Sequence, residues 1–172
     1  MLTISREARI KVGRHAWNVF PLEAFGFLLG KADEEVVHAA LPCSKTRYWR
    51  LFDDRWVGID EHIEKAWSVA KSFDLDVVGL YAATEISNLD TYPIPPLLAS
   101  TRMQLLMYYQ TLCCHACSWI SYRYHERWLM PRDDYLTPPG IRASDAFNQK
   151  RVMKAWRKVF GPIDYSNRSG TL

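Results

Sequence analysis

Apolar positions recur with a helical period at two places in the first half of the chain. The first set comprises Ile4, Ala8, Val12, Ala16 and Val19, and Ser5, near its start, has a side chain that suits a helix N-cap. His15 lies inside this predicted helix, where we expect a partly buried structural side chain rather than a ligand. Asp60 is the expected N-cap of the second helix. Its apolar face comprises Ile59, Ile63, Trp67, Ala70 and Phe73.

Short apolar runs between these helices predict strands. Residues 24–30 and 35–41 are separated by the charged turn 31–34, so they are expected to form a hairpin. Residues 47–52 alternate bulky and basic side chains, as a half-exposed strand does. Residues 76–81 have almost no polar break, which is typical of a central strand.

The second half has a weaker pattern. Its prolines at 93, 95 and 96 disfavour regular structure, and residues 97–110 are then expected to form a helix. Residues 112–124 predict one or two strands, and residues 132–140 are interpreted as a linker. A last helix begins near Ser144 and Asp145. Its expected inward side chains are Phe147, Val152, Trp156, Val159 and Phe160.

The order of these elements predicts an α+β fold, in which a mixed β-sheet is flanked by helices and a C-terminal helix is added. The expected boundaries are 1–131 for the sheet domain and 132–172 for the linker, the basic helix and the tail. A length of 172 residues and 48% hydrophobic content suffice for one sizeable core. Aromatic residues make up 13%, which leaves rings available for an interface.

The net charge of +3 is unevenly distributed. From residue 141 onward seven Lys or Arg face two Asp, so this segment carries +5 and the first 140 residues carry −2. The last helix therefore has a cationic face, formed by Lys150, Arg151, Lys154, Arg157 and Lys158. Nucleic acid is one partner that such a face suits.

The N-terminal residues are charged, and no apolar run approaches the roughly 20 residues that cross a bilayer. We therefore expect a cytoplasmic chain without a membrane partner. The four cysteines fit reduced thiols, and three of them lie within five residues: Cys113, Cys114 and Cys117. With His115 and His125 they form a candidate metal site, whose alternative is a set of small buried core residues.

Three segments resemble the JAMM/MPN (Mov34, JAB) metallopeptidase domain of prokaryotic type. Residues 21–30, PLEAFGFLLG, resemble its opening strand, and residues 77–81, VVGLY, resemble the strand that precedes its His-x-His motif. Residues 92–100, YPIPPLLAS, resemble its Ser- and Asp-bearing motif. The resemblance covers roughly residues 4–109. It implies a cytidine-deaminase-like mixed sheet.

In that family two His and one Asp hold a zinc ion whose fourth ligand is water, and a Glu is the general base. Three protein ligands leave the metal one open position, where bound water becomes acidic enough to attack an isopeptide or peptide bond. By resemblance Glu23 occupies the general-base position. Ala82 and Thr84 occupy the two His positions, and Ile94 and Leu97 occupy those of the Ser and the Asp, with one inserted residue. All three metal ligands are thus missing, and no cofactor is expected.

The loop after residue 84 leaves two alternatives open. Its oxygen donors Glu85, Ser87 and Asp90 suit a rebuilt site for Mg²⁺ or Ca²⁺ better than one for zinc. A frame error in the coding sequence near Ala82 would also hide the family motif.

Three functions follow. The first is a catalytically inactive MPN-like domain that serves as a protein-interaction or scaffold subunit, bound to a catalytic sibling, to a copy of itself or to a ubiquitin-like protein. The second is a divergent zinc-dependent isopeptidase or peptidase that acts on a ubiquitin-like or sulfur-carrier protein. The third is a subunit that associates with nucleic acid through the basic C-terminal helix, in which case salt would weaken the binding.

Overall fold

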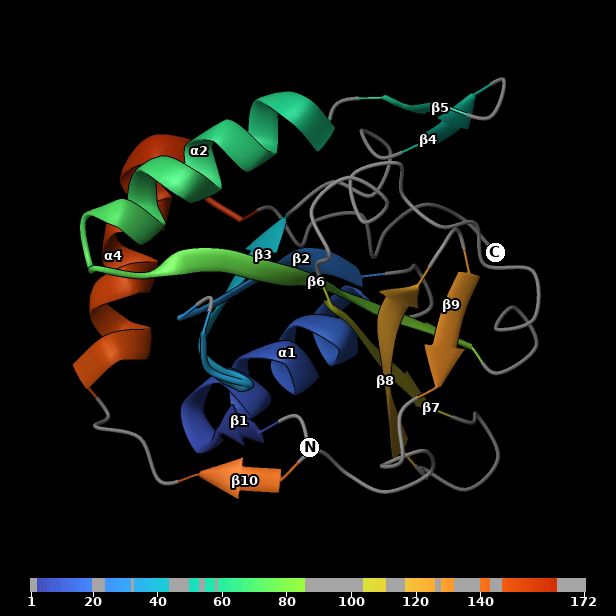
Figure 1. Ribbon diagram of the computed structural model, residues 1–172. Helices are drawn as coiled ribbons and strands as arrows, with labels where there is room; N and C mark the ends of the chain where they lie inside the picture. Colours follow the sequence, from blue (N-terminus) through green and yellow to red (C-terminus); the bar gives the residue numbers. More distant parts are fainter. Residues whose placement is uncertain are drawn as a thin grey trace.

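A computed structural model of the chain places helices on both faces of one mixed β-sheet (Figure 1). It describes residues 3–19, 24–31, 33–43, 50–52, 55–57, 59–85, 104–110, 117–125, 128–131, 140–142 and 147–163, and the side chains of 3–19, 24–31, 33–43, 62–83 and 149–163. The helices are α1 (Arg6–Val19), α2 (Ile59–Lys71) and α4 (Phe147–Phe160). The strands are β1 (Thr3–Ser5), β2 (Ala24–Gly30), β3 (Val36–Cys43), β4 (Arg50–Phe52), β5 (Arg55–Val57), β6 (Asp76–Glu85), β7 (Gln104–Gln110), β8 (Cys117–His125), β9 (Trp128–Pro131) and β10 (Gly140–Arg142).

The large sheet has the strand order β10-β1-β3-β2-β6-β7-β8-β9, and β4 and β5 form a separate two-stranded sheet. The predicted hairpin is confirmed, since β2 and β3 pair antiparallel. The predicted central strand is also confirmed, because β6 pairs antiparallel with β2 and parallel with β7. The chain therefore has the α+β fold class that its pattern predicts.

Strand alternation divides the core into two clusters. Phe25, Phe27 and Leu29 of β2 lie in the cluster beneath α2 and α4, whereas Leu28 of β2 lies in the cluster beneath α1. Figure 1 shows the same division, with α2 and α4 on one side of β6 and α1 on the other. The predicted N-cap of α1 is confirmed, since the backbone N–H of Ala8 donates to Ser5 Oγ at 3.2 Å.

Helix α4 is bound to the outer edge of β3. The side-chain amide of Gln149 pairs with both backbone groups of Ala40: Ala40 N–H donates to Oε1, and Nε2 donates to the Ala40 carbonyl, each at 2.9 Å. Trp156 Nε1 donates to the carbonyl of Pro42 at 2.8 Å. The segment after residue 131 thus contributes α4 to the main core, and it contributes β10, which pairs parallel with β1.

Two predicted core positions are wrong. Trp67 is 40% exposed, because α2 turns Ala66 and Val69 into the core beside Ile63. Val159 of α4 is 42% exposed, whereas Val152 and Trp156 are buried as predicted.

Two predicted elements also need correction. The expected helix over 97–110 is wrong in its described part, where residues 104–110 form strand β7. Residues 105–109 are five consecutive apolar residues, a run that suits a strand between two neighbours better than one face of a helix. Helix α2 begins at Ile59, so Asp60 lies in its first turn rather than at the N-cap.

Candidate functional site

Ala82, which the resemblance aligns with the first His of the family motif, lies in the C-terminal half of β6. This residue pairs with Phe25 of β2 and with Met107 of β7. Its side chain is 1% exposed and lies in the apolar cluster beneath α2 and α4, together with Phe25 and Leu80. A buried methyl group has no lone pair to donate, so this position cannot ligate a metal ion.

The other predicted site residues are only partly within the described chain. Thr84 lies in β6 opposite Tyr109 of β7, and Glu85 is the last residue of β6. The residues that lie outside the described part are Glu23, Ser87, Asp90, Ile94 and Leu97. Residue Ala24, which follows Glu23 in sequence, pairs with Ala83 of β6.

The second candidate metal site is described only at its ends. Cys117 and His125 are the first and last residues of β8, whereas Cys113, Cys114 and His115 lie outside the described residues. Among the residues that the structure describes, no group of three His, Cys, Asp or Glu side chains could hold a metal ion.

A buried polar pair lies behind the Ala82 position, on the α1 face of the sheet. Nδ1 of His15 and the hydroxyl of Tyr81 are 2.7 Å apart, and the two rings meet edge to face at 88°. Burial and, as the smaller cause, the charge of Lys11 together lower the pKa of His15 to about 3. The imidazole is therefore neutral at physiological pH, as expected for a structural His. The nitrogen of a neutral imidazole that carries no hydrogen accepts a hydrogen bond, so the Tyr81 hydroxyl can donate to it.

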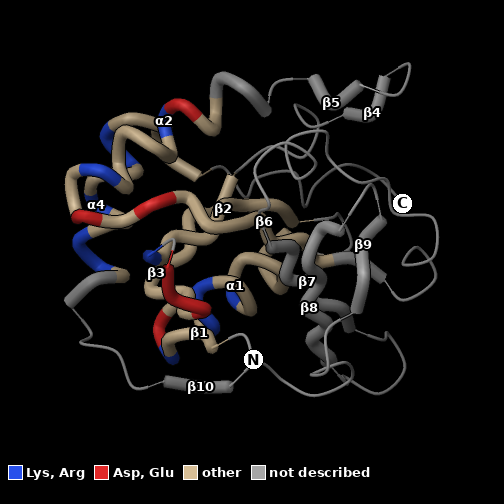
Figure 2. The backbone as a smooth tube through the Cα atoms, in the orientation of Figure 1, with Lys and Arg blue, Asp and Glu red and all other residues tan. Residues whose placement is uncertain are grey.

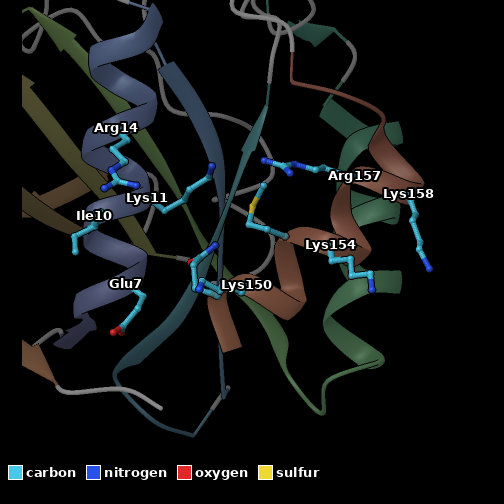
Figure 3. Close-up of a pocket in the computed structure, with 10 residues that line it drawn as sticks. Glu7, Ile10, Lys11, Arg14, Lys150, Lys154, Arg157 and Lys158 are labelled. Carbon is cyan, nitrogen blue, oxygen red and sulfur yellow. The ribbon is translucent and has the colours of Figure 1, made fainter. Parts of the chain in front are cut away.

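Helices α1 and α4 enclose a groove of about 580 Å³ that the sequence pattern did not predict (Figure 3). Six of its lining residues are cationic: Lys11 and Arg14 of α1, and Lys150, Lys154, Arg157 and Lys158 of α4. Glu7 is its one acidic lining residue. Ile10, Met153 and Gln149 complete the lining.

The cations of the groove come from both helices. In Figure 3 Lys11 and Arg14 project from one wall, and Arg157 and Lys154 belong to the other. Burial lowers the pKa of Lys11, and the like charges of Arg157 and Arg14 lower it further. Figure 2 shows the Lys and Arg positions along both α1 and α4. The groove therefore concentrates positive charge, an arrangement that suits an anionic ligand.

The spacing of charged residues in the sequence indicates one of the two helix faces that line the groove. Glu7, Lys11 and Arg14 are spaced by four and three residues, so they follow one face of α1. The pattern does not show that this face lines the same groove as the basic face of α4, since the two segments are about 140 residues apart in sequence.

No protein-family model matches the chain, and no curated protein matches it. None of the described helices is long and apolar enough to span a membrane.

Two solved structures match the chain over most of its length. Protein DSY2949 from Desulfitobacterium hafniense matches with a TM-score of 0.55 and 14% identity, over 86% of this chain and 96% of that one. A protein from Salinibacter ruber matches with a TM-score of 0.48 and 18% identity, over 86% of this chain and 94% of that one. The likeness to the first structure extends over most of both chains and, at 14% identity, concerns the α+β fold alone.

Proposed function

We propose that the chain is an MPN-like domain without the family's zinc ligands, and that it works through protein contacts as an interaction or scaffold subunit. The resemblance of residues 21–30, 77–81 and 92–100 to that family supports the proposal. The central position of β6 beside β2 agrees with the mixed sheet that this resemblance implies.

The observation that carries the proposal is the state of Ala82. At a position where the family places a zinc ligand, this chain has a methyl group buried in the same apolar cluster as Phe25 and Leu80. A hydrolytic zinc needs three protein ligands and one open position, and the residues at the corresponding positions here are Ala82, Thr84 and Leu97. Without the metal, Glu23 has no acidified water from which to accept a proton.

The test has two parts. The purified chain, expressed with zinc in the medium, is analysed for bound metal and assayed on isopeptide-linked ubiquitin-like substrates. The tagged chain is also isolated from its native source, and the proteins bound to it are identified by mass spectrometry. We expect substoichiometric zinc, no cleavage and a protein bound in a fixed ratio.

Two findings would contradict the proposal. Zinc at one equivalent, with cleavage that is abolished by Glu23→Gln, would show that the divergent hydrolase is the right assignment. A chain that purifies alone from its native source would contradict the interaction role.

A further inference from the structure

We propose that the groove between α1 and α4 binds a segment of a partner protein in which acidic side chains flank an apolar anchor. The inference rests on the proposed function, because it specifies the chemistry of the partner that an interaction domain of this kind would bind. It is carried by the groove itself and makes no use of the resemblance to the MPN family.

The groove is strongly cationic. Six Lys or Arg line the groove against a single Glu, and the two helices contribute cations to opposite walls. Lys11 is only half-buried, yet its burial and the charges of Arg157 and Arg14 already disfavour its charged form. A carboxylate placed between these walls would reduce the repulsion among the cations. This gain in electrostatic free energy would favour the binding of an anionic ligand.

The same groove also presents an exposed apolar side chain. Ile10 is 44% exposed although it lies among cations. Met153 also lines the groove, from α4, but it is 7% exposed and belongs to the core cluster. Trp17, seven residues beyond Ile10, continues the same face of α1 and is 56% exposed. Exposed large apolar side chains next to concentrated charge are typical of a surface that binds an amphipathic ligand.

The combination of cations and apolar surface favours some anionic ligands over others. Inorganic phosphate would contact the cations but leave the exposed side chain of Ile10 without an apolar partner. The backbone of a nucleic-acid duplex would do the same, since it presents sugars and phosphates rather than apolar groups. A peptide with Leu or Phe between Asp and Glu residues satisfies both kinds of surface. A volume of about 580 Å³ lies within the range of ordinary ligand pockets, and it suits a few side chains rather than a whole domain.

The variants follow from this arrangement. Arg14→Glu combined with Lys154→Glu reverses one charge on each wall at exposed positions. Ile10→Ser removes the exposed apolar side chain from the groove while the buried core stays unchanged. Lys31→Glu is the matched control, because Lys31 is an exposed cation in the β2–β3 turn and does not line the groove.

The probe is a fluorescein-labelled peptide of Glu and Asp with two central leucines, titrated by anisotropy into the full-length chain. Its comparison ligands are the same peptide with Ser in place of Leu, a short duplex DNA and inorganic pyrophosphate. We expect the leucine peptide to bind about tenfold more tightly than the serine peptide. Both groove variants should weaken it by about tenfold or more, and Lys31→Glu should leave its affinity unchanged.

Several outcomes would overturn the inference. They are equal binding of the serine peptide, tighter binding of the duplex or of pyrophosphate, loss of binding in Lys31→Glu, and absence of binding by the leucine peptide. Capture of the native partner separates this inference from the proposed function. If the wild-type chain and both groove variants capture the partner equally, the interaction role stands and the groove is not its site. If the wild-type chain captures none, both proposals fail.

Discussion

The hydroxyl of Tyr81 lies 2.7 Å from Nδ1 of His15, and this buried contact joins the central strand β6 to helix α1. The pair has no exposed surface through which a substrate could reach it, since both residues are buried. Its role is therefore to stabilise the packing of α1 on the sheet, and its effect should be visible in the stability of the protein.

Stability should fall as the pH is lowered below the pKa of an unfolded histidine. The pKa of His15 is about 3 in the folded protein and about 6.5 in the unfolded chain. Its contribution is complete above about pH 6.5, and between about pH 6.5 and 3 it decreases by about 1.4 kcal/mol per pH unit, because only the unfolded state binds the proton. Urea unfolding at several pH values measures this slope. In His15→Gln the slope between pH 7 and 5 should become shallower, and an unchanged slope would contradict the assignment.

Gly26→Ala should destabilise the protein. A Cβ at this position would overlap the carbonyl oxygen of Leu41 and the ring of Tyr81, and the backbone atom cannot move aside without distorting β3. We expect a loss of about 1–3 kcal/mol in the free energy of unfolding. Gly13→Ala is the matched control, because nothing lies within 4 Å of its added Cβ in α1. That change should stabilise the helix by about 0.5–1 kcal/mol. Equal effects of the two substitutions would contradict the close packing at Gly26.

Gln149→Glu should separate the hydrogen bonds that hold α4 from its apolar packing. The carboxylate keeps the size of the side chain but loses the amide donor that binds the Ala40 carbonyl. Leaving that buried carbonyl without its donor costs about 1–3 kcal/mol, to be measured by chemical denaturation. Lys150→Gln, at the exposed neighbouring position, should change stability by less than about 0.5 kcal/mol.

Lys11→Met should stabilise the fold and weaken ligand binding. Burial and the like charges of Arg157 and Arg14 lower the pKa of Lys11, so keeping its charge costs more free energy in the folded protein than in the unfolded chain. Methionine fills similar space without the charge, so the midpoint of thermal unfolding should rise while the affinity for the acidic leucine peptide falls. A decrease in both quantities would indicate that Lys11 has a structural role instead.

Restoring the missing ligands tests the resemblance to the MPN family directly. The triple variant Ala82→His, Thr84→His and Leu97→Asp should bind zinc at about one equivalent per chain, because three protein ligands suffice for a site with one open position. Metal analysis after gel filtration measures this, and Ala82→His alone is the control that should bind little. A folded triple variant without zinc would show that these positions do not converge as they do in that family.

The sequence predicted those parts of the fold that depend on local periodicity. The α1 face of Ala8, Val12 and Ala16, the β2–β3 hairpin and the central position of β6 all follow from spacing along a single segment. Ile4, which was predicted to begin that helical face, lies in strand β1 instead. Trp67 was misplaced because Ala66 and Val69 define an alternative helical face, and the choice between the two faces is made by the sheet and by α4.

The groove could not be predicted in the same way. Its charge is divided between α1, in the part of the chain with net charge −2, and α4, in the part with +5. Among the contacts that hold α4 on β3 is the Gln149–Ala40 pair, whose residues are 109 positions apart. The sequence around Gln149 does not indicate that its side chain binds the backbone of Ala40. The proximity of the two basic faces is therefore visible only in the three-dimensional structure.

The hydrogen bonds along the outer edge of β3 also restrict how another protein can bind there. The carbonyl of His38 accepts from Ser5 Oγ, both backbone groups of Ala40 bind Gln149, and the carbonyl of Pro42 binds Trp156. A foreign strand cannot extend the sheet by β-augmentation at these residues, because the backbone groups that it would need are occupied. A chain truncated before α4 would leave the backbone groups of Ala40 and the carbonyl of Pro42 without these partners. Strands of other copies could then pair with this edge of β3, so the truncated chain should self-associate instead of binding a partner selectively through its side chains.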